Sequence, residues 1–136
     1  MCLLCKKIIF LFYYVRAINY ASREEYLEAG TILNKAPFKE KFYLYYLLSA
    51  FLYERVYKFQ ESLLFYDQAK YFIHRNTSLN DDEKNYLFLY INYGYIYIYK
   101  VMEQFSKADK IIKENQKISF DIEKVHKSIK KDFVVD

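Results

Sequence analysis

The stretch AINYASREEYLEAGTILNKA, residues 17–36, decides the fold, because it recurs 33 positions further on as AFLYERVYKFQESLLFYDQA, residues 50–69. Small residues at fixed places let two helices cross closely, and aromatic side chains fill the space beside the crossing. The period therefore predicts two consecutive pairs of helices. The matched positions are Ala17 and Ala50, Tyr20 and Tyr53, Tyr26 and Phe59, Ala29 and Ser62, and Ala36 and Ala69.

A third copy of the pattern lies further along the chain. Its first half reads YINYG at residues 90–94 and is followed by Tyr97, and its second half carries Phe105 and Ala108. The interval from Tyr97 to Phe105 is two residues longer than the matching interval in the other copies, which predicts a longer turn. A polar stretch at residues 74–82 precedes this copy and predicts an exposed loop.

Local signals mark where helices begin and end. Ser22 and Glu25 have the spacing of a capping box, and so do Asn80 and Glu83, which predicts a helix start at each place. Pro37 predicts the end of a helix, because proline lacks the backbone N–H that a continuing helix needs. These signals agree with the boundaries of the repeated pairs.

The composition favours helices throughout. A chain of 136 residues has the size of one domain, and this one contains only two glycines and one proline. Sheet proteins and phosphate-binding loops need glycine at tight turns and at close backbone approaches. We therefore expect an all-α protein that forms a single domain over residues 1–136.

The repeated pattern resembles the tetratricopeptide repeat, whose first helix carries aromatic, Leu, Gly and Tyr positions and whose second carries Ala, aromatic and Ala positions. The resemblance implies a helix-pair solenoid with three pairs, at about residues 3–36, 39–74 and 82–116. Beyond them, apolar residues at helical spacing predict a capping helix at about 118–134, which would shield the last apolar face of a solenoid. These residues are Ile118, Ile122, Val125, Ile129 and Phe133.

No residue pattern points to catalysis, a cofactor or a metal. The chain lacks the glycine-rich phosphate loops, the paired zinc-binding histidines and the nucleophile motifs of known enzyme classes. Cys2 and Cys5 have C-x-x-C spacing, but the only histidines, His74 and His126, stand far apart, so two free thiols are the simpler interpretation. We expect a protein that is not an enzyme.

Charge and hydropathy give expectations for partners and location. The net charge of +4 comes from 21 basic and 17 acidic residues, which is a mixed surface and does not indicate nucleic-acid binding. The apolar run near the N-terminus is cut by Arg16 and is shorter than the roughly 20 residues of a membrane span. Residues 3–20 are therefore expected to form a buried first helix, with a targeting or membrane-associated helix as the alternative. We expect no membrane contact and a cytoplasmic location.

The resemblance also implies a concave groove that binds a peptide or protein segment. An Asn in the first helix commonly holds the backbone of a bound peptide in this family, because its amide both donates and accepts hydrogen bonds. Asn92 stands at that place, and a hydrogen bond to a neighbouring helix is its alternative role. Glu54 and Arg55 can equally form a solvated helix end. The expected groove residues are Tyr14, Ile18, Leu47, Phe51, Arg55, Ile91, Asn92, Tyr95 and Tyr99.

Two functional interpretations follow from the resemblance. In the first, the chain is a free-standing adaptor that binds a peptide or a protein. In the second, which rests on a looser resemblance, it is similar to the repeat domain of peptide-pheromone-responsive regulators of low-GC bacteria, lacks their helix-turn-helix domain and acts through dimerisation. The apolar groove residues would then be covered in a homodimer.

Overall fold

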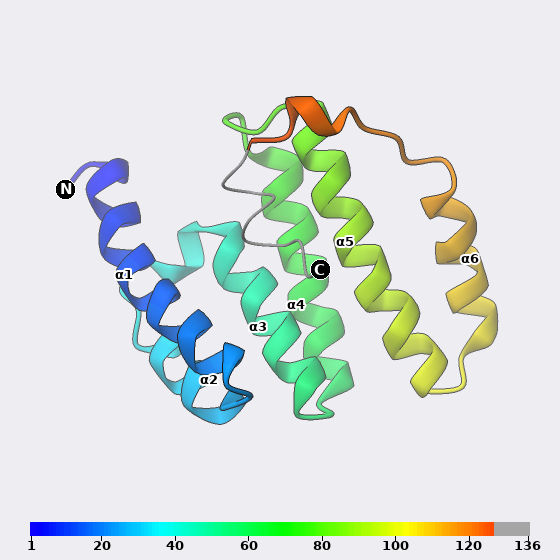
Figure 1. The fold of residues 1–136 in the computed structure, drawn as a ribbon, viewed down its shortest axis with the longest axis horizontal. Coiled ribbons are helices and arrows are strands. Elements are labelled where there is room, and N and C mark those ends of the chain that lie inside the picture. Colours follow the sequence, from blue (N-terminus) through cyan, green and yellow to red (C-terminus); the bar gives the residue numbers. More distant parts are fainter. Residues whose placement is uncertain (127–136) are drawn as a thin grey trace. The chain divides into compact units, whose positions relative to one another are not determined.

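The computed structural model describes residues 1–126, which fold into α-helices and short connections without any β-strand among them (Figure 1). This confirms the all-α class, and two helices lie over each of the three expected ranges, which Arg75 and Asp81 exceed by one residue each. The α-helices of the described residues are α1 (Leu3–Ser22), α2 (Tyr26–Asn34), α3 (Tyr43–Arg55), α4 (Phe59–Arg75), α5 (Asp81–Val101) and α6 (Phe105–Asn115), and their short 3-10 helices are η1 (Lys39–Lys41) and η2 (Ile122–Lys124).

The chain divides into two compact units. The first unit is Met1–Ala69 and the second begins at Lys70, so α4 belongs to both. No helix within residues 1–126 has the length and the apolar character needed to cross a bilayer.

The core of the first unit is built where α1 packs against α2. Phe10 and Ala17 on α1 have no exposed surface, and Ala29 and Leu33 on α2 are equally enclosed. The Phe10 ring also stacks on Phe42 at the start of α3, with 4.9 Å between ring centroids. Burial of these apolar side chains, at about 25 cal/mol per Å² removed from water, stabilises the packing of α1 on the rest of the unit.

The small residues at the start of each second helix are fully buried, as the repeat predicts. Ala29, Ser62 and Ala108 each have no exposed surface. Ser62 also donates its hydroxyl to the Ala50 carbonyl oxygen at 2.7 Å, so the one polar member of the set is satisfied. Larger side chains here would push the two helices of each pair apart.

One turn geometry joins the two helices of every pair. After the first helix, one residue adopts a left-handed conformation with φ near 60°, and the next residue donates its N–H back across the turn to a tyrosine carbonyl. The left-handed residues are Glu24, Tyr57 and Glu103, and the N–H to O distances are 3.0 Å for Glu25 to Tyr20, 2.9 Å for Lys58 to Tyr53 and 2.8 Å for Gln104 to Tyr99.

The third pair therefore has a turn of normal length, which corrects the expectation of a longer one. The equivalent of Tyr53 at the turn is Tyr99, and Tyr97 lies two residues earlier inside α5. On the buried side of α5, Ile91 and Gly94 still correspond to Leu47 and Ala50 of the second copy. The two extra residues thus lengthen α5 by about half a turn, since a helix takes 3.6 residues per turn.

The connection between α4 and α5 is shorter than the expected loop. Only residues 76–80 lie outside helices, because the additional residues extend the two helices themselves. The capping box at Asn80 and Glu83 is present, with the two reciprocal hydrogen bonds at 2.8 and 3.0 Å. The one expected at Ser22 is absent: α1 continues through Ser22, whose hydroxyl donates to the Asn19 carbonyl oxygen.

The prediction of a capping helix at 118–134 is wrong for residues 118–126, and the rest of the predicted range lies outside the described residues. The segment after α6 is non-helical except for η2, and Ile122 is exposed while Val125 is buried. Side chains near the start of α5 make hydrogen bonds to the backbone of the segment after α6, in place of helical hydrogen bonds. The contacts are Asn80 Nδ2 to the Lys124 carbonyl oxygen, Asn85 Nδ2 to the Ser119 carbonyl oxygen, and the Asp121 N–H to Asp82 Oδ1.

Candidate functional site

The expected groove residues separate into two sets by exposure. Tyr14, Leu47, Ile91, Asn92 and Tyr95 are buried, at 5% exposed or less, so a ligand cannot reach them in this conformation. The expectation of a ligand-accessible groove therefore needs correction for these five, because their side chains have almost no exposed surface. The residues that stay accessible are Ile18, Phe51, Arg55 and Tyr99.

Asn92 has the second of its two expected roles. Its Nδ2 donates to Asn115 Oδ1 on α6 at 2.7 Å, so it links two helices. Asn115 occupies the place in the third pair that Ala36 and Ala69 occupy in the others. Within residues 1–126, Asn92 Oδ1 and Asn115 Nδ2 have no hydrogen-bond partner although both atoms are buried. The pair is thus half satisfied, which is costly in a packed interior.

The first unit contains a cleft between α2 and α3 that sequence reasoning missed. Its volume is about 180 Å³, below the roughly 300–1,000 Å³ of typical small-molecule sites. The space therefore fits one or two amino-acid side chains. The lining residues are Tyr26, Leu27, Gly30, Thr31, Leu33, Asn34, Ser49, Leu52, Tyr53, Val56 and Lys58.

Gly30 keeps this cleft open. A Cβ atom built on Gly30 would meet no other atom within 4 Å. Its backbone is helical with negative φ, so the position makes no conformational demand for glycine. Glycine inside a helix costs roughly 0.5–1 kcal/mol relative to alanine. Gly30 is therefore tolerated at some cost to α2, and what it provides is empty space beside Leu33 and Leu52.

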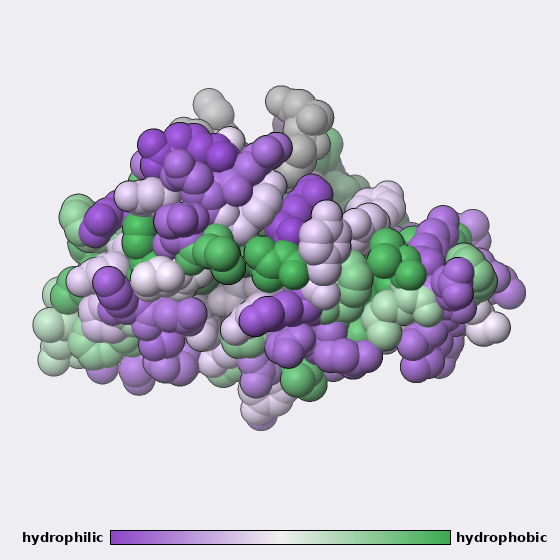
Figure 2. Space-filling view, turned by 90° about the horizontal axis from the view of Figure 1, so that it is seen from below, coloured by the Kyte–Doolittle hydropathy of each residue, from purple (hydrophilic) through white to green (hydrophobic). Residues whose placement is uncertain are grey.

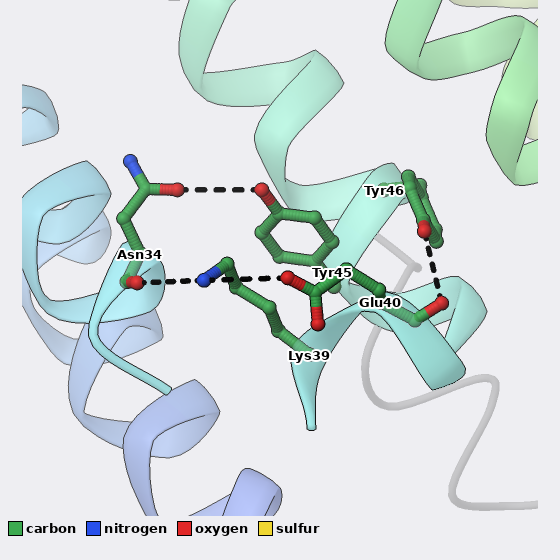
Figure 3. A network of polar contacts seen from close by, with 5 residues as sticks. All are labelled: Asn34, Lys39, Glu40, Tyr45 and Tyr46. Carbon is green, nitrogen blue, oxygen red and sulfur yellow. Dashed lines mark hydrogen bonds and ion pairs between the residues drawn. The ribbon is translucent and has the colours of Figure 1, made fainter. Parts of the chain in front are cut away.

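A polar network holds one end of the cleft in shape (Figure 3). The Tyr45 hydroxyl donates to Asn34 Oδ1 at 3.3 Å, and Lys39 Nζ donates to the Asn34 carbonyl oxygen at 2.9 Å. Lys39 also pairs with Glu40 at 3.6 Å, and the Tyr46 hydroxyl donates to the Glu40 carbonyl oxygen at 2.9 Å. The network ties the end of α2 to η1 and to the first turn of α3.

The chemistry of this network leaves one donor for a ligand. Burial raises the pKa of both Tyr45 and Tyr46, and the charge of Glu40 adds to the effect, so both hydroxyls remain protonated donors at neutral pH. Asn34 Oδ1 is occupied by Tyr45, whereas no hydrogen bond within residues 1–126 uses Asn34 Nδ2. An exposed amide N–H therefore stands at the edge of an apolar cleft.

Two of the expected groove residues adjoin the cleft. The Phe51 and Tyr26 rings make an edge contact with 6.2 Å between their centroids. The Arg55 guanidinium lies over the Phe51 ring, 5.2 Å from its centroid. Lys58, at the other end of the lining, is exposed. The sequence signal that could have located the site is Gly30, the one glycine inside a predicted second helix.

Glu54 differs from its expected role as part of a solvated helix end. The side chain is buried, and burial raises the pKa of its carboxyl group although the Tyr66 hydroxyl and Arg55 act in the opposite direction. The Tyr66 hydroxyl donates to Glu54 Oε1 at 3.1 Å. Glu54 therefore belongs to the packing of α3 on α4, while Arg55 is exposed as expected.

The remaining reactive side chains form no larger cluster in the described part of the chain. Within residues 1–126, no three His, Cys, Asp or Glu side chains come together as metal ligands. Cys2 and Cys5 are exposed free thiols whose sulfur atoms lie 2.9 Å apart at the start of α1. The hydrogen bond between the two thiols lowers the pKa of the Cys2 thiol. Comparison with known protein families, with curated protein sequences and with solved structures gave no match.

Proposed function

We propose that this chain is a non-catalytic, cytoplasmic module that binds a peptide or a protein segment, and that an apolar side chain of the partner enters the cleft between α2 and α3. The observation that carries the proposal is the empty, apolar space beside Gly30. Monomeric proteins keep their interiors packed at high density, so an open apolar cleft indicates a place for a partner's side chain.

The edge of the cleft has the chemistry that a peptide requires. Asn34 Nδ2 can donate to a peptide carbonyl oxygen, and Lys58 can pair with an acidic side chain or a carboxylate. The apolar floor supplies binding energy through burial, at about 0.8 kcal/mol per buried CH₂ group. The tetratricopeptide resemblance supports the same class of function, with the binding surface moved from the expected groove to the cleft.

The test uses two substitutions at one position. Peptides from a displayed random library are selected on the wild-type chain and their affinities are measured by fluorescence polarisation. Gly30→Leu fills the cleft and is expected to weaken binding about tenfold or more, since a displaced apolar anchor is worth about 1.5–3 kcal/mol. Gly30→Ala adds one methyl group and is the matched control, with much smaller loss of affinity and a slightly more stable helix.

Two further measurements make the result decisive. Asn92→Ala should leave peptide affinity unchanged while lowering stability, because Asn92 is buried in the other unit. Selected peptides should share one apolar residue at a fixed place. Peptides that bind Gly30→Leu as tightly as they bind the wild type would show that the cleft is not the binding site.

A further inference from the structure

The outer face of α1 carries a stripe of large apolar side chains that are exposed. Apolar residues reach the molecular surface as separate patches among hydrophilic ones (Figure 2), and α1 contributes more of them than any other helix in the described residues. Their spacing of four, four and three residues places them on one face of the helix. The stripe consists of Leu4 (67% exposed), Ile8 (60%), Phe12 (66%) and Val15 (54%).

This stripe lies opposite the face that packs on α2. Phe10, Tyr14 and Ala17 face the core and are buried, so α1 is apolar on two sides. A soluble surface helix normally has one apolar face and one polar face. The prediction of a buried first helix is therefore correct for the face with Phe10, Tyr14 and Ala17, whereas the opposite face is exposed in the part of the chain that the structure describes.

Positive charge borders the stripe on both sides. At about 100° per residue, Lys7 lies about 60° beyond Leu4 on one edge, and Arg16 lies about 40° beyond Phe12 on the other. The Arg16 guanidinium stands 6.0 Å from the centre of the Phe12 ring, so its stem lies along the stripe. No acidic residue occurs before Glu24, so nothing in α1 neutralises these cations.

From this geometry we infer that α1 docks in the plane of a lipid bilayer with anionic headgroups. The stripe faces the acyl chains, and Lys7 and Arg16 contact the headgroup phosphates. An amphipathic helix with apolar residues on one face and basic residues at its edges binds membranes in this way. The helix does not cross the bilayer, because its other face stays packed on α2 and it is too polar to span.

Charge decides between a bilayer and a second copy of the chain. In a two-fold symmetric contact of α1 with α1 the same patch meets itself, which brings Lys7 and Arg16 of both copies into one interface without an acid. Like charges in a contact are repulsive. An anionic bilayer supplies both an apolar phase for the stripe and negative charge for the basic residues. Each basic residue near the bilayer surface raises the membrane affinity about fivefold.

The experiment is co-flotation of the full chain with phosphatidylcholine vesicles that contain, or lack, phosphatidylserine. We expect binding only to the anionic vesicles, and a strong reduction as the salt concentration rises from about 0.05 M to about 0.5 M, because screening shortens the reach of the charges. The double variant Ile8→Gln/Phe12→Gln should bind about tenfold more weakly or worse, since affinity scales with the apolar area inserted. Lys7→Gln/Arg16→Gln should lose the preference for anionic lipid while keeping the apolar stripe.

Leu64→Gln is the matched control, since Leu64 is 63% exposed on α4, outside the stripe. It should bind vesicles like the wild type. The stripe residues are exposed, so circular dichroism spectra should be unchanged in every variant. If Ile8→Gln/Phe12→Gln loses helicity, Lys7→Gln/Arg16→Gln is used in its place, so that the inference can still be tested. Absence of binding to anionic vesicles overturns the inference. So does a dimer in sedimentation equilibrium that Ile8→Gln/Phe12→Gln dissociates, because the face would then be an interface between copies. Neither outcome bears on the cleft at Gly30.

Discussion

Removing the Tyr66 hydroxyl should cost more stability in a chain with an ionised Glu54 than in a chain in which Glu54 is replaced by a neutral residue. Tyr66 is only 2% exposed, and its hydroxyl donates to Glu54 Oε1 at 3.1 Å. In Tyr66→Phe, water cannot easily replace the lost donor. A hydrogen bond to a charged group contributes about 1.5–3 kcal/mol, and one between neutral groups about 0.5–1.5 kcal/mol.

These magnitudes define a double-mutant cycle. At a pH above the folded-state pKa of Glu54, where the carboxyl group is ionised, Tyr66→Phe should lower the free energy of unfolding by about 1.5–3 kcal/mol in the wild-type background. In the Glu54→Gln background the same change should cost about 1 kcal/mol less, because the amide oxygen carries no charge. The assay is urea unfolding followed by circular dichroism, with the slope on urea checked for constancy.

The pH dependence follows from the direction of the Glu54 shift. Burial raises the folded-state pKa of this carboxyl group above its unfolded value of about 4.3, so the folded state binds the proton more tightly. This contribution to stability is present below the unfolded pKa and is lost as pH rises through the folded pKa. Glu54→Gln should flatten the profile in that range, and Tyr66→Phe should move the loss to higher pH. Equal costs of Tyr66→Phe in both backgrounds, with parallel pH profiles, would refute the reasoning.

Three other substitutions test the packing and the turns. Ala108→Leu should destabilise the second unit by about 1–3 kcal/mol in thermal unfolding, because Ala108 has no free surface and the added atoms overfill the helix crossing; Lys107→Leu next to it, on an exposed site, should change stability by less than about 0.5 kcal/mol. Glu103→Gly should raise stability by about 1 kcal/mol, measured in urea, because glycine adopts φ of 58° without strain. Asn115→Ala should destabilise the second unit by about 1–3 kcal/mol, because Asn92 loses its hydrogen-bond acceptor. Replacing both Asn92 and Asn115 by Leu should be nearly neutral. A double replacement that costs more than Asn115→Ala would contradict this account.

The sequence predicted the helical class and several small residues that are fully buried. Ala29 and Ser62 were matched by a fixed period, and both prove to be fully buried at equivalent places. Such a period is readable because each repeat must solve the same packing problem, so the same sizes of side chain recur. The start of α5 was also readable, since a capping box is a local arrangement of Asn80 and Glu83 that needs no distant contact.

The features that sequence reasoning missed depend on contacts between distant segments. Residues 118–126 have the spacing of a helix, yet Asn80, Asp82 and Asn85 bind their backbone in a non-helical path. The groove positions depended on how each helix is rotated about its axis. A small rotation decides whether Leu47 or Phe51 reaches the surface, and the pattern of apolar residues on α3 does not determine it, because almost every side of that helix is apolar.

Two adjacent residues of α2 show why a small side chain alone does not reveal a site. Ala29 and Gly30 are both small, and a helix places neighbours about 100° apart around its axis. Ala29 faces α1 and has no exposed surface, so its size serves packing. Gly30 faces the cleft, where a side chain would meet nothing within 4 Å, so its size serves no contact in the folded chain. A residue that weakens its own helix without improving any packing is consistent with selection for an external partner, and this separates the proposed binding position from the structural ones.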